Sequence, residues 1–152
     1  MKDRIWQLAG EVTDFTVAAR RRFHENPELG FQEFETTAFI KKELEAAGVE
    51  IVPIAMETGA LAVIKGTAPW KGAGEPPVAG VRADMDALPI EEATGVPYAS
   101  KVKGIMHACG HDGHAAILLG LAKVLQKLRP HFAGTVKLFF QPAEETLYGA
   151  EK

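Results

Sequence analysis

Hydrophobic residues recur at helical spacing in the first part of the chain. Apolar residues at three- and four-residue steps from Ile5 to Phe23 predict one helix, and Asn26-Pro27 is expected to end it. The same spacing predicts a second helix over about residues 32–47, with Gly48 as its C-terminal cap. We therefore expect two helices before the first strand.

Strand-like runs then alternate with a further helical pattern. Residues 49–54 and 60–65 are separated by turn-prone residues and are expected to pair as a hairpin. Residues 78–81 form a nearly continuous apolar run, typical of a strand buried on both faces. A strong helical pattern covers residues 111–128, and residues 135–141 alternate as another strand. This alternation predicts an α/β fold with a mixed or largely parallel sheet.

Composition is that of a single folded unit. The chain has 152 residues, of which 47% are hydrophobic, enough to bury roughly 70% of the surface of the unfolded chain. The net charge is −3 and no long block carries one sign, so we expect no nucleic-acid partner. The longest apolar stretch, about residues 115–122, is much shorter than a membrane span, and no export signal is visible. A single cysteine fits a reducing compartment, so the expected location is the cytoplasm.

Three clusters of polar residues lie at or just beyond the apolar runs. They span residues 82–86, 106–114 and 141–145. The carboxyl ends of strands carry the ligand site in open α/β sheets, so the three clusters are expected to converge. Residues 82–109 otherwise lack periodicity, and so long an irregular stretch within a domain is typical of a functional loop.

The residue types in two of these clusters favour metal-assisted hydrolysis. Cys109 and His111 place a thiol and an imidazole within one short turn, which suits zinc, manganese, cobalt or nickel better than calcium. Glu144 and Glu145 are adjacent, so that one carboxylate could bind a metal while the other moves protons. A metal would polarise a carbonyl and acidify water, and a nearby glutamate would take the proton.

Each cluster taken alone also has an explanation without chemistry. Asp84 and Asp86 project to the same side of an extended chain, which suits binding and orienting roles, but they could also cap a turn before Pro89. Adjacent glutamates are usually solvated, and a free cysteine among surface histidines needs no ligand. His24 and His131 stand alone and are expected to be surface or capping residues outside the site. The HExxH signature of helical zinc proteases is absent.

Four segments resemble one known family. RADMDALPI (82–90), MHACGHDGHAA (106–116) and QPAEE (141–145) are similar to the amidohydrolase branch of the dinuclear metallopeptidases, which includes N-acyl-amino-acid amidohydrolases, hippurate hydrolase and indole-acetyl-amino-acid hydrolases. RRRFHENPELGFQEFET (20–36) resembles the usual amino-terminal segment of that family. The resemblance covers essentially the whole chain. It implies a zinc-exopeptidase-like, three-layer α/β catalytic domain with a mixed, mainly parallel sheet.

The resemblance also implies residue roles and a substrate class. Cys109, His111 and Glu145 would be metal ligands, Glu144 the general base, and Asp86 a residue that orients a ligand. The implied cofactors are two divalent metal ions per complete site, manganese or zinc, with cobalt and nickel as further candidates. The implied reaction is hydrolysis of the amide bond of a small N-acyl amino acid, with no nucleic-acid or membrane partner.

The resemblance places residues 1–152 in the amino-terminal part of such a catalytic domain, incomplete at its C-terminal end. Members of the family are more than twice as long, insert a lid and dimerisation domain after the paired glutamates, and take two more histidine ligands from beyond that motif. We therefore expect an incomplete metal site in this chain alone. We also expect an uncovered apolar face, formed by Val136, Leu138 and Phe140, that promotes self-association.

Two other functions remain open at this point. Cys109 could be a nucleophile with His107 or His111 as its base, although this leaves the aspartate and glutamate pairs unexplained. Alternatively, the chain could bind a metal or a partner subunit without catalysing a reaction. The response of activity to a chelator and to a thiol reagent would separate these alternatives.

Overall fold

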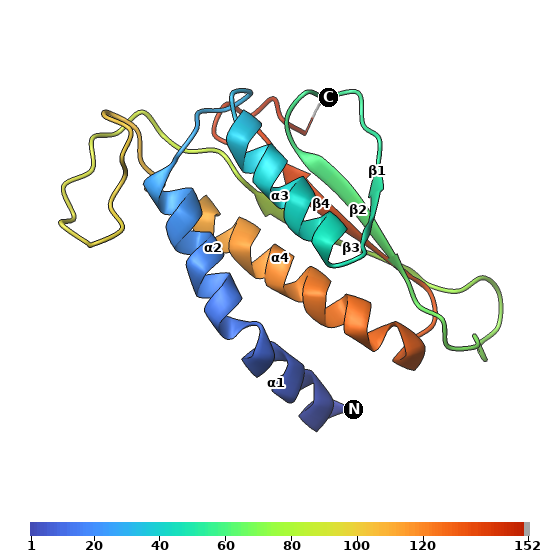
Figure 1. The fold of residues 1–152 in the computed structure, drawn as a ribbon. Helices are drawn as coiled ribbons and strands as arrows, with labels where there is room; N and C mark the ends of the chain where they lie inside the picture. The colour runs from blue at the N-terminus through green and yellow to red at the C-terminus, as the bar shows by residue number, and fades with distance from the viewer. Residues whose placement is uncertain (151–152) are drawn as a thin grey trace.

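The computed structural model describes residues 1–150, which contain a four-stranded sheet of order β1-β2-β4-β3 (Figure 1). The strands are β1 (Glu50–Val52), β2 (Ala60–Lys65), β3 (Val78–Asp84) and β4 (Thr135–Gln141). β1 and β2 form the expected antiparallel hairpin, β2 and β4 are also antiparallel, and β3 and β4 are parallel. The expected mixed α/β sheet is confirmed, but in the described residues antiparallel pairings outnumber parallel ones.

Helices lie on one face of this sheet (Figure 1). They are α1 (Lys2–Glu11), α2 (Thr13–Glu25), α3 (Phe34–Ala46) and α4 (His111–Leu128), followed by a 3-10 turn (Arg129–His131). α4 packs on β2, β3 and β4, α3 packs on β1 and β2, and α1 and α2 pack on α4. Within residues 1–150 the other face of the sheet has no helix, so two layers are present rather than the three expected. No helix in this part of the chain is long and apolar enough to cross a membrane.

The hydrophobic core lies between the sheet and the helices. Alternate residues of β2 and β4 point into it, because successive side chains of a strand face opposite sides of the sheet. Leu138 and Phe140 are therefore buried, and the expectation that they form an uncovered face is wrong; Val136 is partly buried against the same core. The uncovered apolar residues are on the opposite face, where Phe139 is 39% exposed and Val78 63% exposed.

β3 is more exposed than its apolar sequence predicts. The residues expected to be buried on both faces include Val78, Ala79 and Gly80, and all three are exposed. β3 is an edge strand of the described sheet, and nothing in residues 1–150 covers its outer face. Burial begins only at Ala83 and Asp84, where β3 ends beside the first turn of α4.

The single helix predicted from Ile5 to Phe23 is two helices that meet at Val12. The hydroxyl of Thr13 donates to the Ala9 carbonyl at 3.0 Å, and that of Thr16 donates to the Val12 carbonyl at 2.9 Å. Side-chain hydroxyls that bond backbone carbonyls in this way compete with the helix and bend it. The apolar stripe continues across the break, so periodicity alone does not reveal it.

Candidate metal centre

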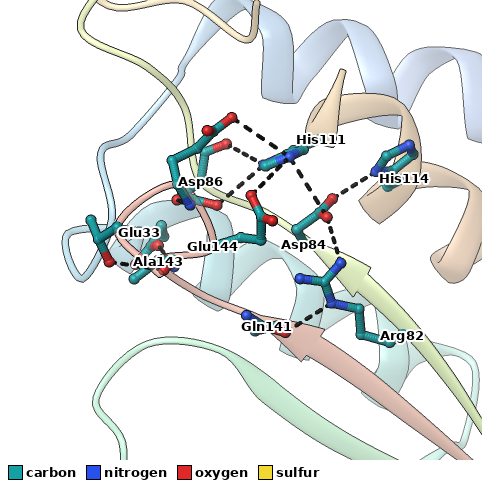
Figure 2. Close-up of polar contacts among 11 residues, drawn as sticks. Glu33, Arg82, Asp84, Asp86, His111, His114, Gln141, Ala143 and Glu144 are labelled. Atoms are coloured by element: carbon teal, nitrogen blue, oxygen red, sulfur yellow. Dashed lines mark hydrogen bonds and ion pairs between the residues drawn. The ribbon is translucent and has the colours of Figure 1, made fainter. Parts of the chain in front are cut away.

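The three predicted clusters meet where β3 and β4 end, beside the N-terminus of α4 (Figure 2). β3 and β4 are parallel, and Asp84 at the end of one strand pairs with Gln141 at the end of the other. α4 begins at His111, whose ring lies between the two strand ends. The topology therefore brings together residues from all three clusters.

Cys109, His111 and Glu145 form a compact group of metal-binding atoms. Their sulfur, imidazole nitrogen and carboxylate oxygen all lie within 4.8 Å of one another. Oε1 of Glu145 is buried and has no hydrogen-bond partner among the described residues, a costly arrangement that a cation would relieve. A thiol, an imidazole and a carboxylate are the donors that zinc and related transition metals take. The residues present thus fit a divalent metal ion.

The orientation of His111 is fixed from one side. Its Nδ1 lies 3.0 Å from the carbonyl oxygen and 3.2 Å from Oδ1 of Asp86. Both partners only accept hydrogen bonds, so Nδ1 carries a hydrogen and the Nε2 lone pair of the neutral ring faces the group. Nε2 lies 3.6 Å from Asp84, 3.7 Å from Glu144 and 3.8 Å from Glu145. Burial lowers the pKa of His111, but the Asp86 hydrogen bond and the surrounding carboxylates outweigh burial and raise it.

Asp86 joins two of the converging segments. Oδ1 accepts from His111, and Oδ2 accepts the backbone N–H of Glu145 at 2.9 Å. Burial raises the pKa of Asp86, but these hydrogen bonds outweigh burial and hold the pKa below its usual range. The carboxylate is therefore ionised at neutral pH, which is the form that accepts both hydrogen bonds.

Asp84 has a different set of partners. One of its oxygens lies 2.6 Å from Nδ1 of His114, and the other accepts from Arg82 at 2.8 Å (Figure 2). Arg82 also donates to Gln141 at 2.8 Å, which ties β3 to the end of β4. Asp84, His111 and His114 form a second group with metal-ligand spacing. The sequence analysis assigned no role to His114. Its position one helical turn after His111 could have indicated that the two histidines lie on the same face of the helix.

Glu144 lies at the open side of the group. Its side chain is 34% exposed, whereas the side chain of His111 is 3% exposed. This carboxylate can therefore meet a solute that approaches the three ligating atoms.

Comparisons with known proteins agree with this geometry. A model described as peptidase family M20/M25/M40 matches residues 80–152. The chain is 52% identical over 143 residues to IAA-amino acid hydrolase ILR1-like 2 of Arabidopsis thaliana, covering 93% of this chain and 31% of that protein. It is 54% identical over 136 residues to N-acetyl-L-cysteine deacetylase of Bacillus subtilis, covering 90% of this chain and 31% of that protein. The chain is thus similar to proteins of peptidase family M20/M25/M40, and the family model itself covers residues 80–152.

A solved structure extends the likeness to the fold. The chain superposes on a dinuclear metal binding peptidase from the M20 family of Bacillus subtilis with a TM-score of 0.82 and 45% identity. The match covers 99% of this chain and 39% of that structure. The chain spans about a third of the length of the curated relatives it matches.

The sequence analysis did not predict a buried network next to the candidate metal centre. His24 is 6% exposed, and the expectation that it is a surface or capping residue is wrong. Its Nδ1 lies 2.8 Å from Asp112 and its Nε2 lies 3.2 Å from Glu92, while Arg20 donates to Asp112 at 3.1 Å. The partners of His24 are 88 and 68 positions away in the sequence, so no local pattern signals them. His131 is exposed, as expected.

Two further buried titratable residues lie near the candidate metal centre. His107 is 5% exposed and neither ring nitrogen has a hydrogen-bond partner among the described residues. Burial lowers the pKa of His107 to about 4, so its ring is neutral at physiological pH. Glu33 is fully buried, and burial raises the pKa of its carboxyl. Neither residue had a role in the site predicted from the sequence.

Proposed function

We propose that this protein hydrolyses the amide bond of N-acyl amino acids with the help of divalent metal ions. The observation that carries the proposal is the convergence of Cys109, His111 and Glu145 within 4.8 Å, next to a second carboxylate on Glu144. The names of two relatives, an IAA-amino acid hydrolase and an N-acetyl-L-cysteine deacetylase, support the substrate class. The substrate is expected to be a small molecule.

Cys109, His111 and Glu145 would hold the metal. Manganese and zinc are the first candidates, and cobalt and nickel also suit this mixture of donors. A bound divalent cation would polarise the scissile carbonyl and acidify water. A second cation, as the dinuclear relative suggests, would need donors in addition to these three residues.

The remaining residues would move protons and fix orientation. Glu144 is the proposed general base: it accepts a proton from the attacking water and returns it to the leaving amine. Its carboxylate is partly exposed and 3.7 Å from His111, which places it between the ligating atoms and solvent. Asp86 holds the hydrogen on Nδ1 of His111, so that Nε2 stays free to bind.

The cysteine-nucleophile alternative has His111 as its candidate base, because a nitrogen of this ring lies within 4.8 Å of the Cys109 sulfur and Asp86 holds only Nδ1. His107 is a poorer candidate, since both its ring nitrogens are buried and have no hydrogen-bond partner among residues 1–150. The Glu145 carboxylate and the other acidic groups nearby raise the pKa of Cys109, which opposes formation of a thiolate in the absence of a cation.

Metal removal and thiol modification of the intact protein test the proposal. Deacylation of N-acetyl amino acids should stop after dialysis against a chelator and return with manganese or zinc, while iodoacetamide should modify Cys109 only in the metal-free form. Activity that survives metal removal but is lost to iodoacetamide would instead favour a cysteine nucleophile. Stoichiometric metal without turnover would indicate a binding protein.

A further inference from the structure

Glu33 is a buried carboxylate attached to the turn that carries the paired glutamates. It immediately precedes α3 and is 0% exposed. Its Oε1 accepts the backbone N–H of Ala143 at 2.8 Å, across 110 positions of sequence (Figure 2). Ala143 directly precedes Glu144 and Glu145. This hydrogen bond thus connects the amino-terminal part of the chain to the backbone that directly precedes the paired glutamates.

The turn has a conformation that needs external support. Ala143 has φ +52, in the left-handed region that residues with a side chain rarely adopt. Such a conformation persists only where the surrounding structure holds it in place. The backbone of Gly30 packs directly on Ala143, where a Cβ at Gly30 would lie 3.0 Å from the Ala143 Cα. The segment that contains Gly30 and Glu33 is therefore the support on this side.

The other end of the turn is held by Asp86. The backbone N–H of Glu145 donates to Oδ2 of Asp86 at 2.9 Å, two residues after the N–H that donates to Glu33. Two buried carboxylates thus hold alternate backbone N–H groups of one short turn. Asp86 also contacts His111, whereas no hydrogen bond or ion pair of the described residues joins Glu33 to the three candidate ligands.

We propose that Glu33 is a positioning residue, whose hydrogen bond to the Ala143 N–H sets the turn that directs Glu144 and Glu145 toward the metal ligands. The roles of these two glutamates rest on the proposed function, but the clamp on the turn does not. A carboxyl oxygen accepts hydrogen bonds, so Oε1 of Glu33 matches the N–H that Ala143 presents in its left-handed conformation. Without this acceptor the N–H would be buried and unpaired, and the turn would relax.

Hydrogen exchange of the backbone amides in the intact protein tests the clamp directly. Glu33→Ala should accelerate exchange of the Ala143 amide by roughly 10- to 100-fold, because a buried N–H loses its acceptor. Glu33→Gln keeps an acceptor oxygen and should stay near the wild-type rate. Glu33→Asp withdraws the carboxylate by one methylene and should behave like Glu33→Ala, which keeps the test available if the alanine variant does not fold.

Glu28 provides the matched control. Its carboxylate accepts the N–H groups of Glu35 at 3.1 Å and Thr36 at 2.8 Å, so it holds the start of α3 and does not contact the turn. Glu28→Ala should accelerate exchange at the start of α3 and leave Ala143 unchanged. Equal acceleration at Ala143 in the Glu28 and Glu33 variants would mean general loosening and would overturn the proposal.

Cobalt binding and kinetics add readouts at the site itself. Glu33→Ala should weaken the thiolate-to-cobalt absorption band in a Co²⁺ titration and lower kcat more than it changes KM, with recovery in Glu33→Gln. Metal-dependent hydrolysis with unchanged Ala143 exchange in Glu33→Ala would refute the clamp and leave the proposed function standing. Faster Ala143 exchange in a protein that neither binds Co²⁺ nor hydrolyses amides would refute the proposed function and leave the clamp standing.

Discussion

His111 shows how one side chain can connect three segments that are distant in the sequence. Nδ1 contacts Asp86 after β3, and Nε2 faces Glu144 and Glu145 after β4. The ring itself belongs to the first turn of α4, where burial keeps it in one orientation. The two nitrogens therefore have separate tasks, because one is held by the protein and the other is directed to the ligand site.

Removal of the thiol is the sharpest test of the ligand set. In Cys109→Ala the group loses its sulfur donor, so we expect bound metal to fall well below the wild-type stoichiometry in elemental analysis. His114→Ala is the control, since His114 belongs to the second group with Asp84 and His111. If Cys109→Ala keeps the wild-type metal content and His114→Ala loses its metal, the second group is the one that binds the metal.

The role of Glu144 can be separated from metal binding. Glu144→Gln in the intact protein should keep its metal, because Glu145 remains, but an amide cannot accept the proton of the attacking water. Loss of a general base lowers turnover by about 10²- to 10⁴-fold, which a steady-state assay with an N-acetyl amino acid would measure. Activity near that of the wild type would place the base on another residue.

At the scale of elements, His24 is one of the residues that tie the long loop after β3 to the helices. His24 on α2 reaches Glu92 in this loop and Asp112 on α4. We expect His24→Ala to destabilise the fold by about 1–3 kcal/mol, since it leaves the buried Asp112 short of a partner. Limited proteolysis should show faster cleavage around Glu92, and chemical denaturation would give the change in stability.

His131 is the matched histidine for this measurement. It is exposed and follows α4 in the 3-10 turn, so His131→Ala should change stability by less than about 0.5 kcal/mol. Similar losses in the two variants would argue against a specific role of the His24 contacts.

Elements with a strong local pattern were predictable, and those shaped by distant contacts were not. β2, β4 and α4 have the predicted bounds, because strict alternation and helical periodicity each report burial on one face. The break at Val12 was missed because hydroxyl-to-carbonyl bonds cause it without interrupting the apolar stripe. The exposure of β3 was missed because its sequence does not tell whether anything covers its outer face.

The same distinction applies to the site. Cys109, His111, Glu144 and Glu145 were singled out by residue type and spacing, and the fold brings them together. The partners of His24 and Glu33 are far away in the sequence, so one sequence without structure gives no reason to pair them. Helical spacing did place His114 near His111, but its contact with Asp84 required the register between α4 and β3.

At the scale of the whole molecule, one face of the sheet has no helix over it in residues 1–150 and carries exposed apolar side chains. Phe139 and Val78 are exposed there, and a cavity of about 310 Å³ lined by Ile54, Leu61 and Phe139, among others, opens at the end of β4. β1 and β3 are the edge strands of the described sheet. Uncovered apolar surface and unpaired edges both favour association between chains.

We therefore predict that residues 1–152, prepared alone, self-associate and have negligible amidohydrolase activity. Three donors leave the coordination shell of a metal incompletely filled by protein, which weakens binding and leaves the geometry poorly fixed. Sedimentation velocity and an N-acetyl amino acid assay would check the two parts. A monodisperse monomer with chelator-sensitive hydrolysis would show that three ligands suffice.

The parallel pairing of β3 with β4 has a consequence for the order of folding. Arg82 and Gln141, whose side chains hydrogen-bond near the strand ends, are 59 positions apart, with the long loop and α4 between them. Pairing strands across such a distance requires closure of a large loop, which slows folding relative to the local β1-β2 hairpin. Asp86 follows β3, and Glu144 and Glu145 follow β4. These carboxylates come together only when the two strands have paired. The metal centre is thus expected to assemble late, and a cation that binds it would stabilise only chains that have finished folding.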